Sequence, residues 1–145
     1  LICSKIANKY KNERVDIVLG AAIGGIVISA GVGRILNVKH IFAERVNNIM
    51  DLKRGFVLPE GSRVLIVEDI VTTGGSIREL IQIVKERYGK IVGIQSILDR
   101  NHKLVDFGYP YEPLLQFPVE SWEENDCPDW LFEIPVTKPG SSGRT

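Results

Sequence analysis

The sequence predicts an α/β fold: a doubly wound, mostly parallel sheet with helices on both faces. Short apolar runs of the kind found in buried strands, at residues 15–19, 64–67 and 91–98, alternate with helical patterns at 2–10, 26–36 and 77–88. The junctions from strand to helix are rich in glycine or small residues. In such sheets, ligands lie across the carboxyl ends of the strands.

Length and composition narrow the class of protein. We expect residues 1–140 to form one domain and residues 141–145 to be a disordered tail. Lys plus Arg equals Asp plus Glu, at 18 each, which argues against nucleic acid or a membrane surface as partner. No apolar run approaches the roughly 20 residues of a membrane helix. The two cysteines form no C-x-x-C pattern, which favours a reduced, cytoplasmic setting without zinc or disulfides.

The first third of the chain predicts a helix, a strand and a second helix. Ile2, Ile6 and Tyr10 recur at helical spacing, so we expect this helix to pack on the sheet. The buried strand at 15–19 runs into G-A-A-I-G-G-I at 20–26, and an apolar helix follows to about Leu36. The first turn of that helix is available to an anion, although a tight packing turn is the alternative.

The next segment combines weak periodicity with clustered cations. Residues 38–43 are predicted as a short strand that ends at Glu44 and Arg45, and residues 56–58 as another. Between them, residues 46–55 are polar and carry Lys53 and Arg54. Charge alone leaves two interpretations open: a solvated hairpin, or a mobile lid whose cations close over an anionic ligand.

The stretch from Val64 to Ile77 reads V-L-I-V-E-D-I-V-T-T-G-G-S-I and contains the strongest motif of the chain. After the apolar run come Glu68 and Asp69, whose carboxylates suit sugar hydroxyls or a hydrated Mg²⁺. The turn at 72–76 then supplies amide and hydroxyl donors suited to a phosphate, with a helix dipole behind them. Together the two halves describe a site for a ribose 5-phosphate. The Walker phosphate loop is absent, so a nucleoside triphosphatase is not indicated.

The strand predicted at 91–98 finishes in Asp99 and Arg100, at the ligand-binding edge of the sheet. An arginine there can bind a carboxylate through two hydrogen bonds, while a surface ion pair is the alternative. Residues 113–119 are predicted as a last, edge strand, and residues 120–126 as an acidic surface turn. His40 and His102 have no paired ligand or nucleophile nearby in sequence, so we interpret both as structural.

Val64–Ile77 closely resembles the phosphoribosyl pyrophosphate signature of type I phosphoribosyltransferases. This resemblance implies an enzyme that transfers a 5-phosphoribosyl group from phosphoribosyl pyrophosphate to a nitrogen of a base, releases pyrophosphate and needs Mg²⁺. L-D-R at 98–100, A-E-R…L-K-R-G-F at 43–56 and the loop at 20–26 resemble orotate-specific members, which implies orotate as the base and orotidine 5′-monophosphate as the product. The alternatives are a purine base or uracil, or a regulator that senses phosphoribosyl pyrophosphate without catalysis.

The resemblance also implies residue roles. Lys53, Arg54 and Asp69 are the implied catalytic residues. The implied substrate-binding residues are Glu68, Asp69, Val71, Thr72, Thr73, Gly74, Gly75, Ser76, Ala22, Gly24, Gly25, Arg45 and Arg100. No direct metal ligand is expected: Mg²⁺ would be held through substrate and waters, with Glu68 and Asp69 as the candidate protein groups.

Two expectations concern the assembly and the ends of the chain. The resemblance implies a homodimer in which the basic loop is shared across the interface. Members of the family build a hood over the base from residues upstream of the first strand, and we expect part of that hood to be lacking here. In the tail, Trp130 stands where similar sequences often have a second cysteine, so no metal site is expected there.

Overall fold

The structure is a computed structural model that describes residues 1–120, 122, 126–132, 134 and 135. The tail at 141–145 and most of the acidic segment at 120–126 lie outside these residues. The elements are, in order, α1 (Ile2–Lys9), β1 (Ile17–Ala21), α2 (Gly24–Leu36), β2 (Lys39–Val46), β3 (Ile49–Leu52), β4 (Arg63–Val71), α3 (Gly75–Glu86), β5 (Lys90–Asp99), β6 (Tyr111–Gln116) and the short α4 (Asp129–Phe132).

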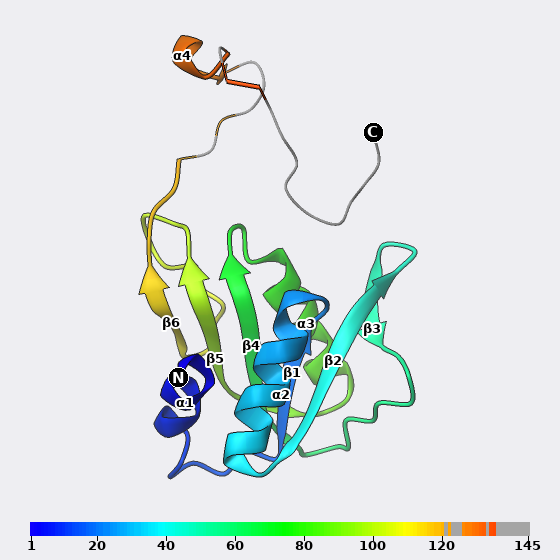
Figure 1. The fold of residues 1–145 in the computed structure, drawn as a ribbon. Coiled ribbons are helices and arrows are strands. Elements are labelled where there is room, and N and C mark those ends of the chain that lie inside the picture. The colour runs from blue at the N-terminus through cyan, green and yellow to red at the C-terminus, as the bar shows by residue number, and fades with distance from the viewer. Residues whose placement is uncertain (121, 123–125, 133, 136–145) are drawn as a thin grey trace.

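The six strands form one sheet in the order β3-β2-β1-β4-β5-β6. All neighbouring pairs are parallel except β2 with β3. The carboxyl ends of β1, β2, β4, β5 and β6 therefore lie at the same edge of the sheet. Helices α1 and α2 cover one face and α3 covers the other (Figure 1). The predicted doubly wound, mostly parallel sheet is confirmed, and β6 lies at an edge as expected.

The core consists of two apolar layers, one on each face of the sheet. Between α3 and the sheet, Leu80 of the helix and Ile66 and Ile94 of the strands have fully buried side chains. Beneath α1 and α2, Ile6 and Leu65 are equally buried, which confirms that the first helix packs on the sheet. Burial on both faces explains why the central strands read as continuous apolar runs rather than as alternating ones.

The strand and helix that flank the central turn are longer than predicted. β4 continues to Val71 because it keeps pairing with β5 as far as Asp99. Helix α3 begins at Gly75, two residues before the first apolar position of its pattern. Only the three residues from Thr72 to Gly74 therefore separate the strand from the helix, which makes the turn tight.

The polar segment after β2 forms a hairpin, the first of the two interpretations. Asn47 and Asn48 both adopt left-handed backbone conformations, with φ of 51° and 63°. This is the geometry of a two-residue hairpin turn, and β3 pairs antiparallel with β2 from Val46 to Ala43. The strand predicted at 56–58 is wrong: these residues form no strand, and the side chains of Phe56 and Leu58 pack against the core from a loop instead.

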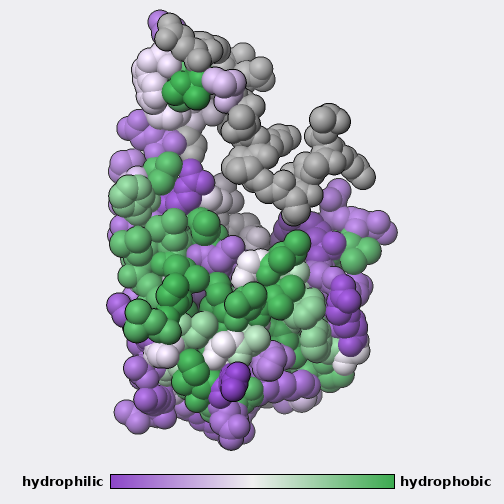
Figure 2. Space-filling model, viewed as in Figure 1, coloured by the Kyte–Doolittle hydropathy of each residue, from purple (hydrophilic) through white to green (hydrophobic). Residues whose placement is uncertain are grey.

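Apolar side chains also gather at the surface of the face that carries α1 and α2 (Figure 2). Ile23, Val27 and Ile35, at or within α2, are exposed. Patches of this kind often mark surfaces that contact another protein. Within the described residues, no helix has both the length and the apolar character needed to cross a membrane.

Candidate active site

A pocket of about 270 Å³ opens where β4 runs through its turn into α3. Most of the residues predicted to bind phosphate and ribose meet there. The lining consists of Arg45, Glu68, Ile70, Val71, Thr72, Thr73, Gly74, Gly75, Ser76 and Ile77. Arg45 and Glu68 are its only charged members, so hydroxyls and backbone groups make up most of its polar surface.

The floor of this pocket is the turn at 72–76. Gly74 precedes α3 in a left-handed conformation, with φ of 77°, and a Cβ there would lie 2.7 Å from the ring of Phe107. Glycine is therefore required both for the conformation and for the contact. The N-cap residue Gly74 has no side chain, and the Gly75 N–H makes only a long hydrogen bond to Thr73 Oγ1, at 3.4 Å, so the first N–H groups of α3 remain available to an anion. Val71 is 1% exposed and contributes only its backbone to the pocket.

Glu68 and Asp69 project to opposite faces of the sheet. Glu68 lies on the side of Ile66, beneath α3, and lines the pocket. Asp69 lies on the side of Val67, where a Cβ on Gly24 would meet its Oδ2 at 1.8 Å. Because β4 continues through both residues, their side chains leave the strand in different directions, yet the Asp69 side chain still lies within hydrogen-bonding reach of Glu68.

The environment of Glu68 favours its protonated form. Its side chain is 6% exposed, and burial, with the neighbouring Asp69 carboxylate, raises the pKa of Glu68 to about 8. A backbone hydrogen bond from the Asp69 N–H to Glu68 Oε1 at 3.1 Å opposes this shift. Near pH 7 the carboxyl group can thus donate a hydrogen bond into the pocket as well as accept one.

The predicted anion loop at 20–26 lies beside Asp69. Gly20 and Gly25 touch through their backbones, since a Cβ on Gly20 would lie 2.4 Å from the Gly25 oxygen. The Ala22–Ile23 peptide bond is cis, and no side chain caps the first turn of α2. Ala22 and Gly24 thus border an uncapped helix N-terminus, the feature that the anion interpretation requires.

The three predicted cations of the 43–56 segment each have a carboxylate partner. Arg45, at the rim of the pocket, forms an ion pair with Glu79 of α3. Arg54 donates two hydrogen bonds to Glu44, at 2.9 and 3.0 Å. Lys53 Nζ lies 3.4 Å from Asp51 Oδ2.

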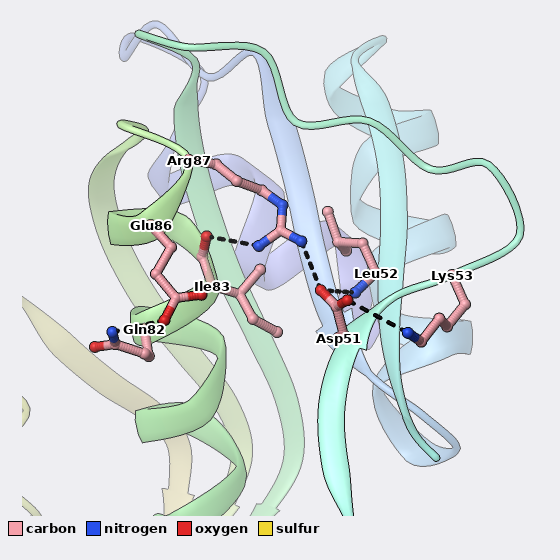
Figure 3. A network of polar contacts seen from close by, with 7 residues as sticks. All are labelled: Asp51, Leu52, Lys53, Gln82, Ile83, Glu86 and Arg87. Carbon is pink, nitrogen blue, oxygen red and sulfur yellow. Dashed lines mark hydrogen bonds and ion pairs between the residues drawn. The ribbon is translucent and has the colours of Figure 1, made fainter. Parts of the chain in front are cut away.

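Lys53 and Arg54 follow β3, at the base of the hairpin rather than at its tip, and do not line the pocket. Figure 3 shows how this base is attached to α3: Arg87 Nη2 lies 2.5 Å from Asp51 Oδ1. Burial by itself would raise the pKa of Asp51, but hydrogen bonds from Leu52 N–H, Arg87 and Lys53 lower it. The two cations are therefore held in place away from the pocket.

Arg100 lies in a second pocket, of about 280 Å³, that adjoins the first. Thr72 and Thr73 line both pockets. The second pocket also includes Asn101, His102 and Val119, which the sequence analysis did not propose as site residues. The only signal for Asn101 and His102 was their position directly after Arg100, and His102 was interpreted as structural.

The donor set agrees with the way Mg²⁺ is usually held. In the described part of the chain, no three His, Cys, Asp or Glu side chains gather into a group that could hold a metal ion. One carboxylate, Glu68, faces the pocket. Mg²⁺ is commonly bound through one or two carboxylates together with substrate phosphates and waters, so these residues fit a substrate-bound ion.

Comparison with known proteins identifies the family. A family model described as phosphoribosyl transferase domain matches residues 2–122. This chain belongs to the phosphoribosyltransferase family. It is 47% identical over 141 residues to the orotate phosphoribosyltransferase of Caldicellulosiruptor bescii, covering 97% of this chain and 74% of that protein. It is 42% identical over 143 residues to the protein of the same name from Thermotoga maritima, covering 99% and 76%.

Solved structures of phosphoribosyltransferases show the same fold. Adenine phosphoribosyltransferase from Rhodothermus marinus matches with a TM-score of 0.68 at 18% identity, over 80% of this chain and 77% of that one. The UMP synthase of Leishmania donovani matches with a TM-score of 0.65 at 22% identity, over 79% of this chain and 26% of that one. The family and the fold implied by the Val64–Ile77 signature are confirmed.

Proposed function

We propose that this phosphoribosyltransferase transfers a 5-phosphoribosyl group from phosphoribosyl pyrophosphate to orotate, giving orotidine 5′-monophosphate and pyrophosphate in pyrimidine biosynthesis. The observation that carries the proposal is the pair of adjoining pockets around Thr72 and Thr73. One is lined by amides and hydroxyls for a phosphate, and the other contains Arg100. Relatives at 41–47% identity, all named orotate phosphoribosyltransferase, support this choice of base.

The turn at 72–76 binds the 5-phosphate. Its hydroxyls and the uncapped N–H groups of α3 donate hydrogen bonds to the phosphate oxygens, and Arg45 supplies positive charge at the rim. The phosphate is remote from the reacting carbon. Its binding energy therefore positions the sugar rather than taking part in bond breaking.

Both acids bind the sugar at the end of β4, where the Asp69 side chain lies within hydrogen-bonding reach of Glu68. Glu68 reaches the ribose hydroxyls from the phosphate pocket, and Asp69 reaches them from the side of the 20–26 loop. Displacement at an anomeric carbon passes through an oxocarbenium-like state. The negative charge of Asp69 stabilises the positive charge that develops in that state, which is why we assign it a catalytic role.

The pyrophosphate lies between the 20–26 loop and the basic hairpin. Ala22, Gly24 and Gly25 present it with the uncapped N-terminus of α2. Glu68 or Asp69, together with the substrate and waters, would hold Mg²⁺, which would supply positive charge for the leaving group. Lys53 and Arg54, whose own side chains are exposed, supply the remaining positive charge once they leave their partly buried carboxylate partners Asp51 and Glu44.

Arg100 recognises the carboxylate of orotate in the second pocket through two hydrogen bonds. We also propose a homodimer in which Lys53 and Arg54 act on the partner's site, because they do not line the pocket of their own chain. The exposed apolar side chains of α2 supply a surface for such association. Cys3 and Cys127 are both free thiols, in keeping with a reducing cytoplasmic setting.

A base-panel assay tests this function. The protein is mixed with phosphoribosyl pyrophosphate, Mg²⁺ and one base at a time: orotate, uracil, hypoxanthine or adenine. We expect orotate absorbance in the ultraviolet to fall and the other bases to remain unchanged. Turnover of uracil or a purine without orotate would contradict the base. Binding of phosphoribosyl pyrophosphate by calorimetry without turnover of any base would instead indicate a sensor.

A further inference from the structure

Asp99 is a buried acid that the proposed reaction does not use. It ends β5, is 0% exposed and has no ion-pair partner among the described residues. Hydrogen bonds satisfy it instead: Tyr111 O–H donates to Oδ2 at 2.8 Å, and Asn101 N–H and Nδ2 donate to Oδ1, each at 2.8 Å. A buried carboxylate is costly unless such a network compensates it.

Asn101 connects this acid to the phosphate turn. The Nδ2 group that donates to Asp99 also donates to the Thr72 carbonyl oxygen, at 2.6 Å. Next to it, the Arg100 N–H donates to the Val71 carbonyl oxygen at 2.9 Å. The residues after β5 are thus bound to the last residue of β4, Val71, and to the first residue of the turn, Thr72.

Tyr111 fixes the Asp99 carboxylate by donating a hydrogen bond to Oδ2. Its hydroxyl lies 2.9 Å from Ser96 Oγ, and its ring packs edge-on against Phe107, 5.0 Å between centroids. Burial, together with the Asp99 carboxylate, raises the pKa of Tyr111, so the phenol keeps its proton and remains a donor. Neither Asp99 nor Tyr111 lines either pocket. Their effect on a ligand can pass only through the residues that they hold.

We propose that Asp99 and Asn101 are positioning residues that fix the base-side Arg100 relative to the phosphate turn at Thr72. The inference rests on the proposed function, since it assigns the two pockets to the two reactants. A fixed separation between the pockets holds the attacking nitrogen of the base in line with the anomeric carbon. Misplacement of reacting groups by about 1 Å can lower a rate by roughly a hundredfold.

The test compares Asn101→Ala with Gln116→Ala in steady-state kinetics of the intact chain. Asn101→Ala removes the bridge to Thr72 and keeps the backbone bond to Asp99. Gln116 is the matched control, because its Nε2 donates to the carbonyl oxygens of Asn101 and His102 without reaching Thr72. We expect Asn101→Ala to lower kcat about 10- to 100-fold with each KM changed less than about threefold, and Gln116→Ala to stay within about twofold of wild type.

A second set of variants separates positioning from direct contact, since Asn101 itself lines the second pocket. Tyr111→Phe should lower kcat about 3- to 10-fold without raising either KM, and Asp99→Asn should retain more activity than Asp99→Ala. In the Asp99→Ala/Asn101→Ala double variant, the losses should be less than additive, because both residues act through one bridge.

The possible results distinguish the positioning role of Asn101, the role of Asp99 and the proposed function. An Asn101→Ala enzyme with wild-type kcat, or a loss shared equally by Gln116→Ala, would overturn the positioning role. A loss in Asn101→Ala with unchanged Tyr111→Phe and Asp99→Ala would overturn the role of Asp99. A wild-type protein that makes no orotidine 5′-monophosphate would overturn the proposed function together with the inference, and that result is visible before any variant is made.

Discussion

Glu68 and Asp69 are neighbours in the chain whose carboxyl groups have different surroundings. One is enclosed beneath α3 and faces the phosphate pocket, and the other packs over Gly24 at the start of α2. The alternation of a strand produces this division. Burial raises the pKa of Glu68, so this acid can be neutral near pH 7.

Replacing Glu68 by glutamine should make stability less dependent on pH. The folded-state pKa of about 8 exceeds the ordinary value of 4.5, so between these values the folded state binds more protons than the unfolded state. Stability of the wild type therefore falls as pH rises through this window. The glutamine variant mimics the protonated form of Glu68, so its free energy of unfolding should increase relative to that of the wild type as pH rises. The increase is about 1.4 kcal/mol for each unit by which the folded-state pKa of Glu68 exceeds its unfolded-state pKa.

Urea unfolding at pH 5, 6.5 and 8 measures this advantage, with the exposed Glu60→Gln as the control. The control should follow the wild-type profile. A Glu68→Gln variant that tracks the wild type at all three pH values would show that the acid is ionised in the folded protein.

The kinds of residue that line this site were predictable from sequence. The directions in which the Glu68 and Asp69 side chains leave β4 were not. All five residues of the T-T-G-G-S turn line the pocket that the structure contains. The strand was expected to stop at Val67, however, because the apolar run stops there. It continues to Val71 only because β5 offers backbone partners that far, and such pairing depends on residues about 28 positions away.

The β2–β3 hairpin combines a fixed base with a tip that extends from the sheet. Met50 and Leu52 are buried in the core beneath α3, and Asp51 binds Arg87 between them. Beyond Met50, pairing continues only with β2, as far as the turn at Asn47 and Asn48. The base and the tip can therefore differ in mobility, as a loop that admits substrate requires.

Removing the cations of the hairpin base should slow turnover more than it weakens binding. We expect Lys53→Ala or Arg54→Ala to lower kcat about 100-fold, because the charge is needed mainly as pyrophosphate departs. The dissociation constant for phosphoribosyl pyrophosphate, from calorimetry, should change less than about threefold. Lys11→Ala, an exposed cation beyond α1, is the control. Unchanged kcat in both variants would remove the hairpin from the mechanism.

Helices α1, α2 and α3 were predictable because their apolar residues recur at helical spacing. The buried strands were predictable because each is a short continuous apolar run. The hairpin was not, because its strands are short, half polar and held by tertiary contacts such as the Asp51–Arg87 pair. Its turn had a weak signal: Asn-Asn tolerates left-handed backbone, but the usual hairpin pair is Asn-Gly. The strand predicted at 56–58 was wrong because a short apolar triplet is equally compatible with a loop that packs its side chains on the core, as Phe56 and Leu58 do.

The sheet as a whole gathers its site from segments far apart in the chain. Parallel strands bring the 20–26 loop, the 72–76 turn and the 99–102 segment to one edge, although they are some 80 residues apart. Alternation of strands and helices was sufficient to predict this arrangement. It carried no information on assembly, because an interface depends on surface shape rather than on the period of buried residues.

Mixing two inactive variants tests the shared-site homodimer. A mixed dimer of Lys53→Ala and Asp69→Asn subunits has one site in which both the hairpin and the acid are intact. If the variants are mixed after reversible unfolding, random assembly gives about half mixed dimers and about a quarter of wild-type activity. Activity no higher than the mean of the two parent variants would place each hairpin on its own subunit's site, and a monomer in sedimentation would exclude the dimer.

The contact between Asp69 and Gly24 also limits how this enzyme can be redesigned. A cation grafted at position 24 would place its first side-chain carbon 1.8 Å from the Asp69 carboxylate oxygen. Because that oxygen is the end of a side chain, Asp69 would have to rotate away from the start of α2 to make room. A substitution at this glycine would therefore change where the acid points as well as adding a charge.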